Sequence, residues 1–276
     1  MADTHPTATE PEAPREGNGR PASSAGVHAA LRVLDLLATR GPLQLAELGR
    51  ELGAPKSTLH RICAILVDRG WIVRDADGRF DLGIRSLRLG SRADELPIVV
   101  GFRSVAAHLL TRHDETVALA VLDGDESLYV AIEETSHPVR LVTHVGNATP
   151  AFASASGRVV LSSQPPAAVH ALFGGRPLVT PTGRRLNGVP ELLEILDVVR
   201  ARGYAENLEE TAVGLYAASV PVTNERGATL AALTVLVPTS RLTEARHAAI
   251  VADLREAGRA LSDHVGWLPS YTARRP

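Results

Sequence analysis

The pattern of apolar and polar positions in the first third of the chain predicts three helices. In residues 27–40 apolar side chains recur every three or four positions, the spacing of a helix with one buried face. A second, short helix ends at Gly53, because glycine adopts without strain the positive φ that terminates helices. A third begins at Pro55, since proline suits the first helical position, and runs to about Arg69. The buried stripe predicted for the first helix consists of Ala30, Leu31, Val33, Leu34, Leu37 and Ala38.

The third helix has two faces of different chemistry. An apolar arc that can pack on the preceding helix holds Leu59, Ile62, Cys63 and Leu66. The residues beside this arc or away from it are Lys56, Ser57, Thr58, His60, Arg61 and Ala64. Their charged and hydrogen-bonding groups suit phosphate oxygens and base edges. An ordinary solvated helix shows the same pattern, so the helix alone leaves both interpretations open.

A predicted hairpin directly after this helix favours the DNA-binding interpretation. Asp77-Gly78 is a strong turn signal between two short strands at 71–74 and 79–82. The apolar residues of these strands are Trp71, Val73, Phe80 and Leu82. A helix-turn-helix followed by such a wing places one helix in the DNA major groove. Arg79 at the wing tip is then a further candidate contact, and an ordinary surface arginine is the alternative.

The rest of the chain predicts a second domain of mixed structure. Helices are expected at 83–96, 98–112, 156–163, 167–173, 191–202 and 243–265, and strands at 117–122, 127–133, 140–144, 216–223 and 229–237. Hairpins interleaved with helices are typical of a mainly antiparallel α+β domain. The expected organisation is a disordered tail at 1–25, a winged helix-turn-helix domain at 26–82, a linker helix at 83–97, a mixed domain at 98–268 and a C-terminal tail at 269–276.

Charge and composition fit a sequence-specific DNA-binding protein. The 276 residues carry a net charge of −2, so the chain is not a polycation. Residues 26–90 hold ten basic against seven acidic side chains, whereas 91–276 hold seventeen against twenty. The single cysteine, Cys63, excludes an intrachain disulfide and is expected to be a buried thiol. The chain shows no membrane span and no signal-peptide pattern, and we therefore expect a cytoplasmic protein without a membrane partner.

Short motifs across both domains resemble the IclR family of bacterial transcriptional regulators. They are Leu43-Gln44-Leu45-Ala46-Glu47-Leu48, Pro55-Lys56-Ser57-Thr58-Leu59-His60-Arg61, Arg79-Phe80-Asp81-Leu82-Gly83, Leu87-Arg88-Leu89-Gly90, Glu115-Thr116-Val117-Ala118-Leu119, Ala155-Ser156-Gly157-Arg158, Val199-Arg200-Ala201-Arg202-Gly203-Tyr204, Glu209-Glu210 and Pro221-Val222. Each is unspecific alone, but their order and spacing make chance agreement improbable. The resemblance implies a winged-helix head, a linker helix, a GAF-like effector-binding domain at 98–268, and a homodimer or homotetramer.

The resemblance also implies which residues meet double-stranded operator DNA. The family's contacts carry over to Lys56, Ser57, Thr58, His60 and Arg61, with Gln44 and Arg79 as lesser candidates. Lys56 and Arg61 are expected on phosphates, and the three other residues of the helix nearer to base edges. Two such heads in a dimer would read a pseudo-palindromic operator.

The family's effector pocket carries over to Ala155, Ser156, Asn207, Ala217, Thr234 and Leu236. Asn207, Ala217 and Leu236 stand where relatives that bind small acids carry an acidic residue, a cysteine and a serine, and Arg158 replaces a lysine. A pocket of lower polarity predicts a larger, partly apolar effector such as an aromatic acid or a lactone. Ser156 would cap its helix and bond a carboxylate, or would only cap it. Thr234 is a contact or a structural strand residue.

Catalysis is not expected, because the motifs that it requires are missing. The flanking glycines of a nucleophile elbow are absent around Ser154 and Ser156. His108 and His113 lack the spacing of metal ligands on one helix face, and no cofactor or metal site is predicted. Repressor is the default role and activator the alternative. A small-molecule sensor without DNA binding is a third possibility, against which the complete polar set from Lys56 to Arg61 argues.

Overall fold

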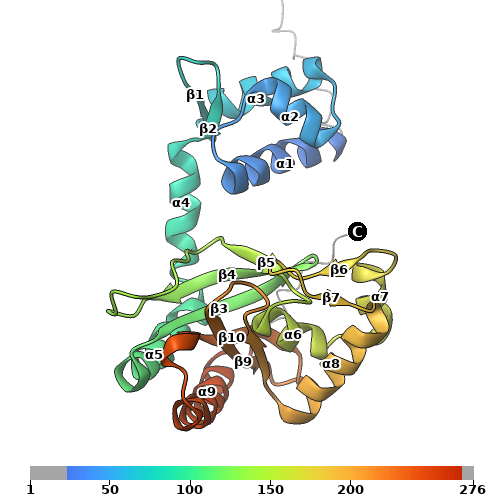
Figure 1. Cartoon of the computed structure of the whole chain (residues 1–276). Helices are drawn as coiled ribbons and strands as arrows, with labels where there is room; N and C mark the ends of the chain where they lie inside the picture. Colours follow the sequence, from blue (N-terminus) through green and yellow to red (C-terminus); the bar gives the residue numbers. More distant parts are fainter. Residues whose placement is uncertain (1–23, 269–276) are drawn as a thin grey trace, which may run out of the picture. The chain divides into compact units, whose positions relative to one another are not determined.

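The computed structural model describes residues 24–268 (Figure 1). The chain divides into two compact units between Leu89 and Gly90. The tails predicted at 1–25 and 269–276 fall outside the described residues, except for Ser24 and Ala25, which open the first helix.

The N-terminal unit is a winged helix-turn-helix, as predicted. Its elements are α1 (Ser24–Arg40), α2 (Leu45–Leu52), α3 (Lys56–Asp68), β1 (Ile72–Arg74) and β2 (Phe80–Leu82). Gly53 ends α2 with φ +60°, which confirms the predicted turn. Pro55 lies one residue before α3 rather than in its first turn. The antiparallel strands pair Ile72 with Leu82, and Leu43 bridges to Phe80.

The predicted buried stripe of α1 is wrong at two residues. Leu31 and Ala38 are exposed on α1, whose fully buried residues are Val33 and Leu37. In the hairpin, Ile72 is buried, whereas Val73, one of the apolar residues assigned to the strands, is exposed. Successive side chains of a strand point to opposite faces, so placing Ile72 against the helices turns Val73 outward.

The predicted linker helix is shorter than expected. It is α4 (Ile84–Ala93), and a turn separates it from α5 (Pro97–His113). No residue of α4 is buried.

The C-terminal unit is built on a six-stranded antiparallel sheet in the order β5-β4-β3-β10-β9-β8. The strands are β3 (Thr116–Asp123), β4 (Glu126–Glu133), β5 (Ala148–Pro150), β8 (Ala205–Leu208), β9 (Leu215–Thr223) and β10 (Thr229–Pro238). The central β3–β10 pair joins segments more than a hundred residues apart in sequence. This arrangement confirms the predicted antiparallel α+β class.

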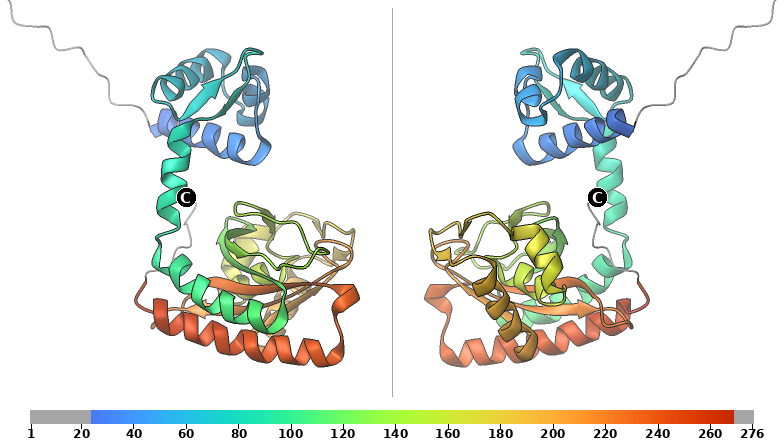
Figure 2. Two further views of the ribbon diagram at one scale, coloured as in Figure 1. Left: turned by 90° about the vertical axis from the view of Figure 1, so that its left-hand side faces the viewer. Right: turned by 90° about the vertical axis from the view of Figure 1, so that its right-hand side faces the viewer.

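Helices cover both faces of this sheet. On one face α5 and α9 (Glu244–Val265) run side by side, and their apolar residues form one core with the strands (Figure 2). Thr243 caps α9 by accepting a hydrogen bond from the Arg246 backbone N–H. On the other face lies α6 (Ala155–Ser162), against which α8 (Val189–Arg202) packs. The remaining elements are α7 (Pro166–Phe173), β6 (Leu178–Val179), β7 (Arg185–Leu186) and η1 (Thr239–Arg241).

The prediction failed at the short strands. Residues 140–144 form no strand, and β5 at 148–150 pairs with β4 instead. The strands β6, β7 and β8 were not predicted. Each has two to four residues, too few for alternation to be visible, and each is defined by its pairing partner alone.

Candidate DNA-binding surface and ligand cavity

The exposed face of α3 carries polar side chains that have no partner within the described part of the chain. Leu59, Ile62, Cys63 and Leu66 are buried, as predicted. The residues exposed on the other side are Lys56, Ser57, Thr58, His60 and Arg61. Within residues 24–268 none of these five side chains makes a hydrogen bond or ion pair. The first turn of α3 also has free backbone N–H groups, which attract phosphate.

Gln44 and Arg79, the two lesser candidates for DNA contact, form hydrogen bonds within the protein. Gln44 is exposed immediately before α2, and its backbone N–H donates to Glu47 Oε2 at 2.6 Å. The Arg79 guanidinium donates to the Pro42 carbonyl at 2.6 Å, and so ties the wing to the loop before α2. The exposed Arg74, which sequence reasoning did not single out, lies over the Phe80 ring and donates to the Gly78 carbonyl.

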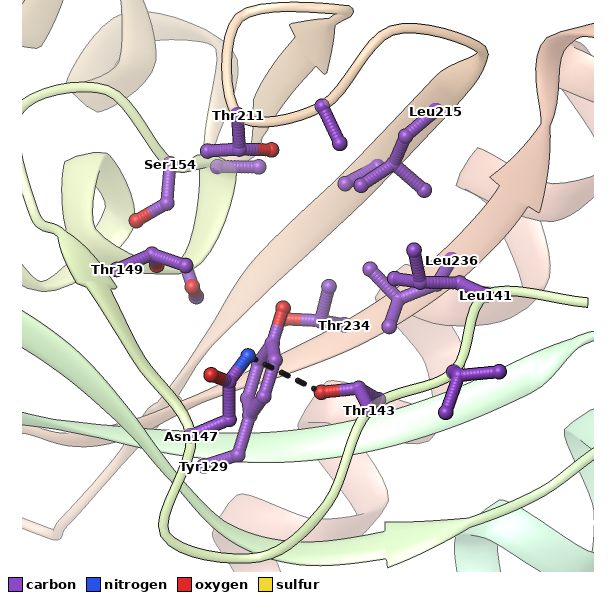
Figure 3. Close-up of a pocket in the computed structure, with 15 residues that line it drawn as sticks. Tyr129, Leu141, Thr143, Asn147, Thr149, Ser154, Thr211, Leu215, Thr234 and Leu236 are labelled. Carbon is purple, nitrogen blue, oxygen red and sulfur yellow. Dashed lines mark hydrogen bonds between the residues drawn. The ribbon is translucent and has the colours of Figure 1, made fainter. Parts of the chain in front are cut away.

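A cavity of about 120 Å³ lies in the C-terminal unit, where the start of α6 meets the sheet (Figure 3). Five of the six predicted effector residues line it: Ala155, Ser156, Ala217, Thr234 and Leu236. Asn207 is not among the lining residues. The residues that the sequence prediction missed are Tyr129, Leu141, Val142, Thr143, Asn147, Thr149, Ser154, Thr211, Ala212 and Leu215. Tyr129 lies two positions after Ser127 on β4, so both side chains point to the same face of the sheet. This alternation along the strand is the sequence signal that could have predicted Tyr129 as a lining residue.

The lining of the cavity combines hydroxyl-bearing and apolar side chains and carries no charge. No Asp, Glu, Lys, Arg or His is among its residues. The Ser156 hydroxyl is hydrogen-bonded to that of Ser127, and the Thr234 hydroxyl to that of Ser219, each at 2.8 Å. The predicted cap is wrong: Ser154, not Ser156, caps α6, since its Oγ accepts a hydrogen bond from the Gly157 N–H at 3.1 Å.

Tyr129 contributes a phenol to the cavity. The ring is buried, and desolvation raises the pKa of its hydroxyl to about 12. The group is therefore neutral at physiological pH and can donate one hydrogen bond to a ligand.

Asn207 and Glu210 hold the loop between β8 and β9 beside the cavity. Asn207 Nδ2 donates to the Ala153 carbonyl, and its Oδ1 accepts from the Glu210 N–H at 3.0 Å. The Glu210 carboxylate pairs with Arg158 of α6 and with Arg184. Thr211 and Ala212, the next residues of this loop, line the cavity. Asn207 therefore positions Thr211 and Ala212 without lining the cavity itself.

A winged helix-turn-helix in one unit and a cavity in the other are the architecture of a class of protein, the ligand-responsive transcriptional regulators. Comparison with known families agrees. Residues 27–76 match the IclR helix-turn-helix domain, and residues 91–263 match the bacterial transcriptional regulator IclR C-terminal domain. The chain belongs to the IclR family of bacterial transcriptional regulators.

Individual relatives extend over nearly the whole chain. The HTH-type transcriptional regulator XynR of Escherichia coli is 31% identical over an alignment of 250 residues, and the match covers 87% of this chain and 97% of XynR. KdgR of the same organism is 27% identical over 90% of this chain and 95% of its own length. These relatives are transcriptional regulators, not enzymes.

Solved structures show the same fold. An IclR regulator from a Silicibacter species has a TM-score of 0.80 at 26% identity and covers 90% of this chain and 99% of its own. An IclR homologue of Microbacterium hydrocarbonoxydans, solved with 4-hydroxybenzoate, has a TM-score of 0.70 at 23% identity, with 87% of this chain and 98% of that chain covered. In residues 24–268 no helix is long and apolar enough to cross a membrane.

Proposed function

We propose that the protein is a cytoplasmic repressor that binds a pseudo-palindromic operator through α3 and is controlled by a small organic effector. The observation that carries the DNA-binding part is the exposed polar face of α3, whose five candidate side chains have no partner in the described chain. In this assignment Lys56 and Arg61 bind phosphates, while Ser57, Thr58 and His60 face base edges. Gln44 and Arg79 are supporting contacts.

Exposed apolar residues near the head support a homodimer or homotetramer. Ile84 and Leu87, which are three residues apart on α4, are 70% and 68% exposed. Val27 and Leu31 of α1 are also exposed. A second copy would cover these side chains and present two recognition helices to the two halves of a palindrome.

The cavity supports an effector with one ring, such as an aromatic acid or a lactone. Its volume of about 120 Å³ is comparable to that of an apolar cavity that admits benzene, roughly 150 Å³. In the absence of a lining cation, a carboxylate would be held by hydroxyl groups and by the N–H groups at the start of α6. The homologue bound to 4-hydroxybenzoate is consistent with such a ligand.

Selection of bound sequences from a random DNA library by the purified full-length protein tests the proposal. We expect an enriched palindrome whose half-site spacing reports the arrangement of the two heads. Operator affinity is then measured with and without ligand, because regulation requires the ligand to favour one DNA-binding state. A reporter gene under the operator separates repression from activation. Weak, salt-sensitive binding without enrichment would contradict the proposal.

A further inference from the structure

One buried hydroxyl among the residues that line the ligand cavity has no hydrogen-bond partner. Among the buried side-chain nitrogen and oxygen atoms of residues 24–268, only Thr149 Oγ1 has no hydrogen-bond partner. The hydroxyls of Ser156 and Thr234, which line the same cavity, are paired with Ser127 and Ser219. Buried polar atoms in proteins are nearly always hydrogen-bonded, so this exception needs a physical explanation.

Thr149 is one of the hydroxyl-bearing residues that line the cavity. Thr149 lies on the edge strand β5, opposite Ser127 in the register with β4. In Figure 3, Thr149, Ser154 and Thr211 gather on one side of the cavity. The apolar residues on the other side are Leu141, Leu215 and Leu236. The cavity therefore offers both hydroxyl groups and apolar side chains to a small molecule.

We propose that the Thr149 hydroxyl is the specificity-determining contact for the polar group of the effector. In this assignment the effector is a one-ring organic acid. Its carboxylate accepts hydrogen bonds from Thr149 and from the start of α6, and its ring packs on Leu215 and Leu236. The inference rests on the proposed role of the cavity as the effector site. It adds that Thr149 selects the class of ligand that binds there. An unpaired hydroxyl destabilises the ligand-free protein, and the ligand removes that penalty when it binds.

Loss of the Thr149 hydroxyl should preserve or raise the stability of the ligand-free protein, but should weaken ligand binding. Thr149→Val removes the unpaired hydroxyl and keeps the shape of the side chain, so we expect an unchanged or higher Tm for the ligand-free protein. The control is Thr234→Val on β10, which leaves the Ser219 hydroxyl without its partner and should lower the Tm. A lower Tm for Thr149→Val would show that the hydroxyl is paired inside the protein, and would overturn the inference.

Calorimetric titration of the full-length protein with benzoate, 4-hydroxybenzoate and cyclohexanecarboxylate tests the ligand. We expect wild type to bind at least one of these acids at millimolar concentration or below. Thr149→Val should weaken that binding about tenfold or more, because hydrogen bonds to a charged group are strong. Thr149→Ser keeps a hydroxyl and should restore most of the affinity. Equal binding by Thr149→Val, or no binding of any of the three acids by wild type, would overturn the inference.

Operator binding distinguishes a failure of this inference from a failure of the proposed function. Thr149→Val is expected to bind the selected operator as wild type does in the absence of ligand. If a ligand that is not an organic acid released the wild-type protein from its operator, the inference would be overturned and the proposed function would stand. Absence of a selected operator would contradict the proposed function.

Discussion

Arg158 and Glu210 form a buried ion pair that fastens α6 to the loop between β8 and β9. Arg158 also donates from Nε to the Phe152 carbonyl at 2.8 Å, so that one guanidinium joins three segments around the cavity. Glu210 receives a second cation, Arg184, from beside β7. The pair therefore sets the position of Thr211 and Ala212, which line the cavity.

Removal of the Glu210 charge should destabilise the C-terminal unit strongly. Glu210→Gln leaves the buried Arg158 without its counter-ion, and breaking such a pair costs about 3 kcal/mol or more. Urea unfolding measures this change. The matched control is Asp197→Asn, because Asp197 pairs with Arg200 on the surface, where an ion pair contributes at most about 1 kcal/mol. Similar losses in the two variants would contradict the structural role of Glu210.

Arg61→Ala should weaken binding to all DNA sequences and flatten the dependence of affinity on salt. One phosphate contact fewer lowers the slope of log K against log salt by about 0.9. Fluorescence anisotropy at several salt concentrations gives this slope. Arg69→Ala is the control, since Arg69 lies at the far end of α3 beside Asp68. An unchanged slope in Arg61→Ala would remove Arg61 from the phosphate contacts.

Gly157→Ala should prevent α6 from docking next to the cavity. A Cβ atom at this position would lie 2.3 Å from both Cα and the carbonyl oxygen of Ala151, and backbone atoms yield little. We expect a loss of about 3 kcal/mol or failure to fold, measured by thermal and urea unfolding. Gly90→Ala, with no atom within 4 Å of the new methyl group, should be neutral or gain up to about 1 kcal/mol of helix stability. Wild-type stability of Gly157→Ala would refute this close packing.

Cys63 should make the folded protein less stable as the pH rises above 9. Burial raises the pKa of the Cys63 thiol from 9.0 to about 11. Between these values the unfolded chain has lost the thiol proton and the folded chain has kept it. The free energy of unfolding therefore falls with pH, by up to about 1.4 kcal/mol per unit.

Urea unfolding between pH 8 and pH 11 checks this dependence against Cys63→Ala, which lacks the titrating group. Only the difference between the two proteins belongs to Cys63, because other groups titrate in the same range. Equal slopes for the two proteins would show that the thiol is not buried in its protonated form.

Much of the N-terminal unit could be predicted from the sequence. The apolar arc of Leu59, Ile62, Cys63 and Leu66 is buried, and Gly53 ends α2 with a positive φ. These features depend on interactions between residues a few positions apart, which the local sequence contains. The hairpin was found for the same reason, although the orientation of Ile72 and Val73 was decided by the helices beneath it.

The cavity depended on tertiary structure to a much greater degree. The resemblance to the family identified Ala155 and Thr234 as lining residues, but Tyr129 and Thr149 entered only when β4 and β5 paired beside α6. Asn207, expected in the wall, instead supports the loop from behind.

The sequence by itself determined the helices, the turns, the wing and the membership of the family, because periodicity and short motifs are local properties of the chain. Tertiary structure decided which side chains share the cavity, since β3 and β10 bring together segments more than a hundred residues apart. It also decided which polar groups are paired and that Thr149 Oγ1, alone among the buried side-chain nitrogen and oxygen atoms of residues 24–268, is not. Hydrogen-bond partners such as Ser219 and Thr234 are set by strand register, which depends on contacts that no local window of sequence contains.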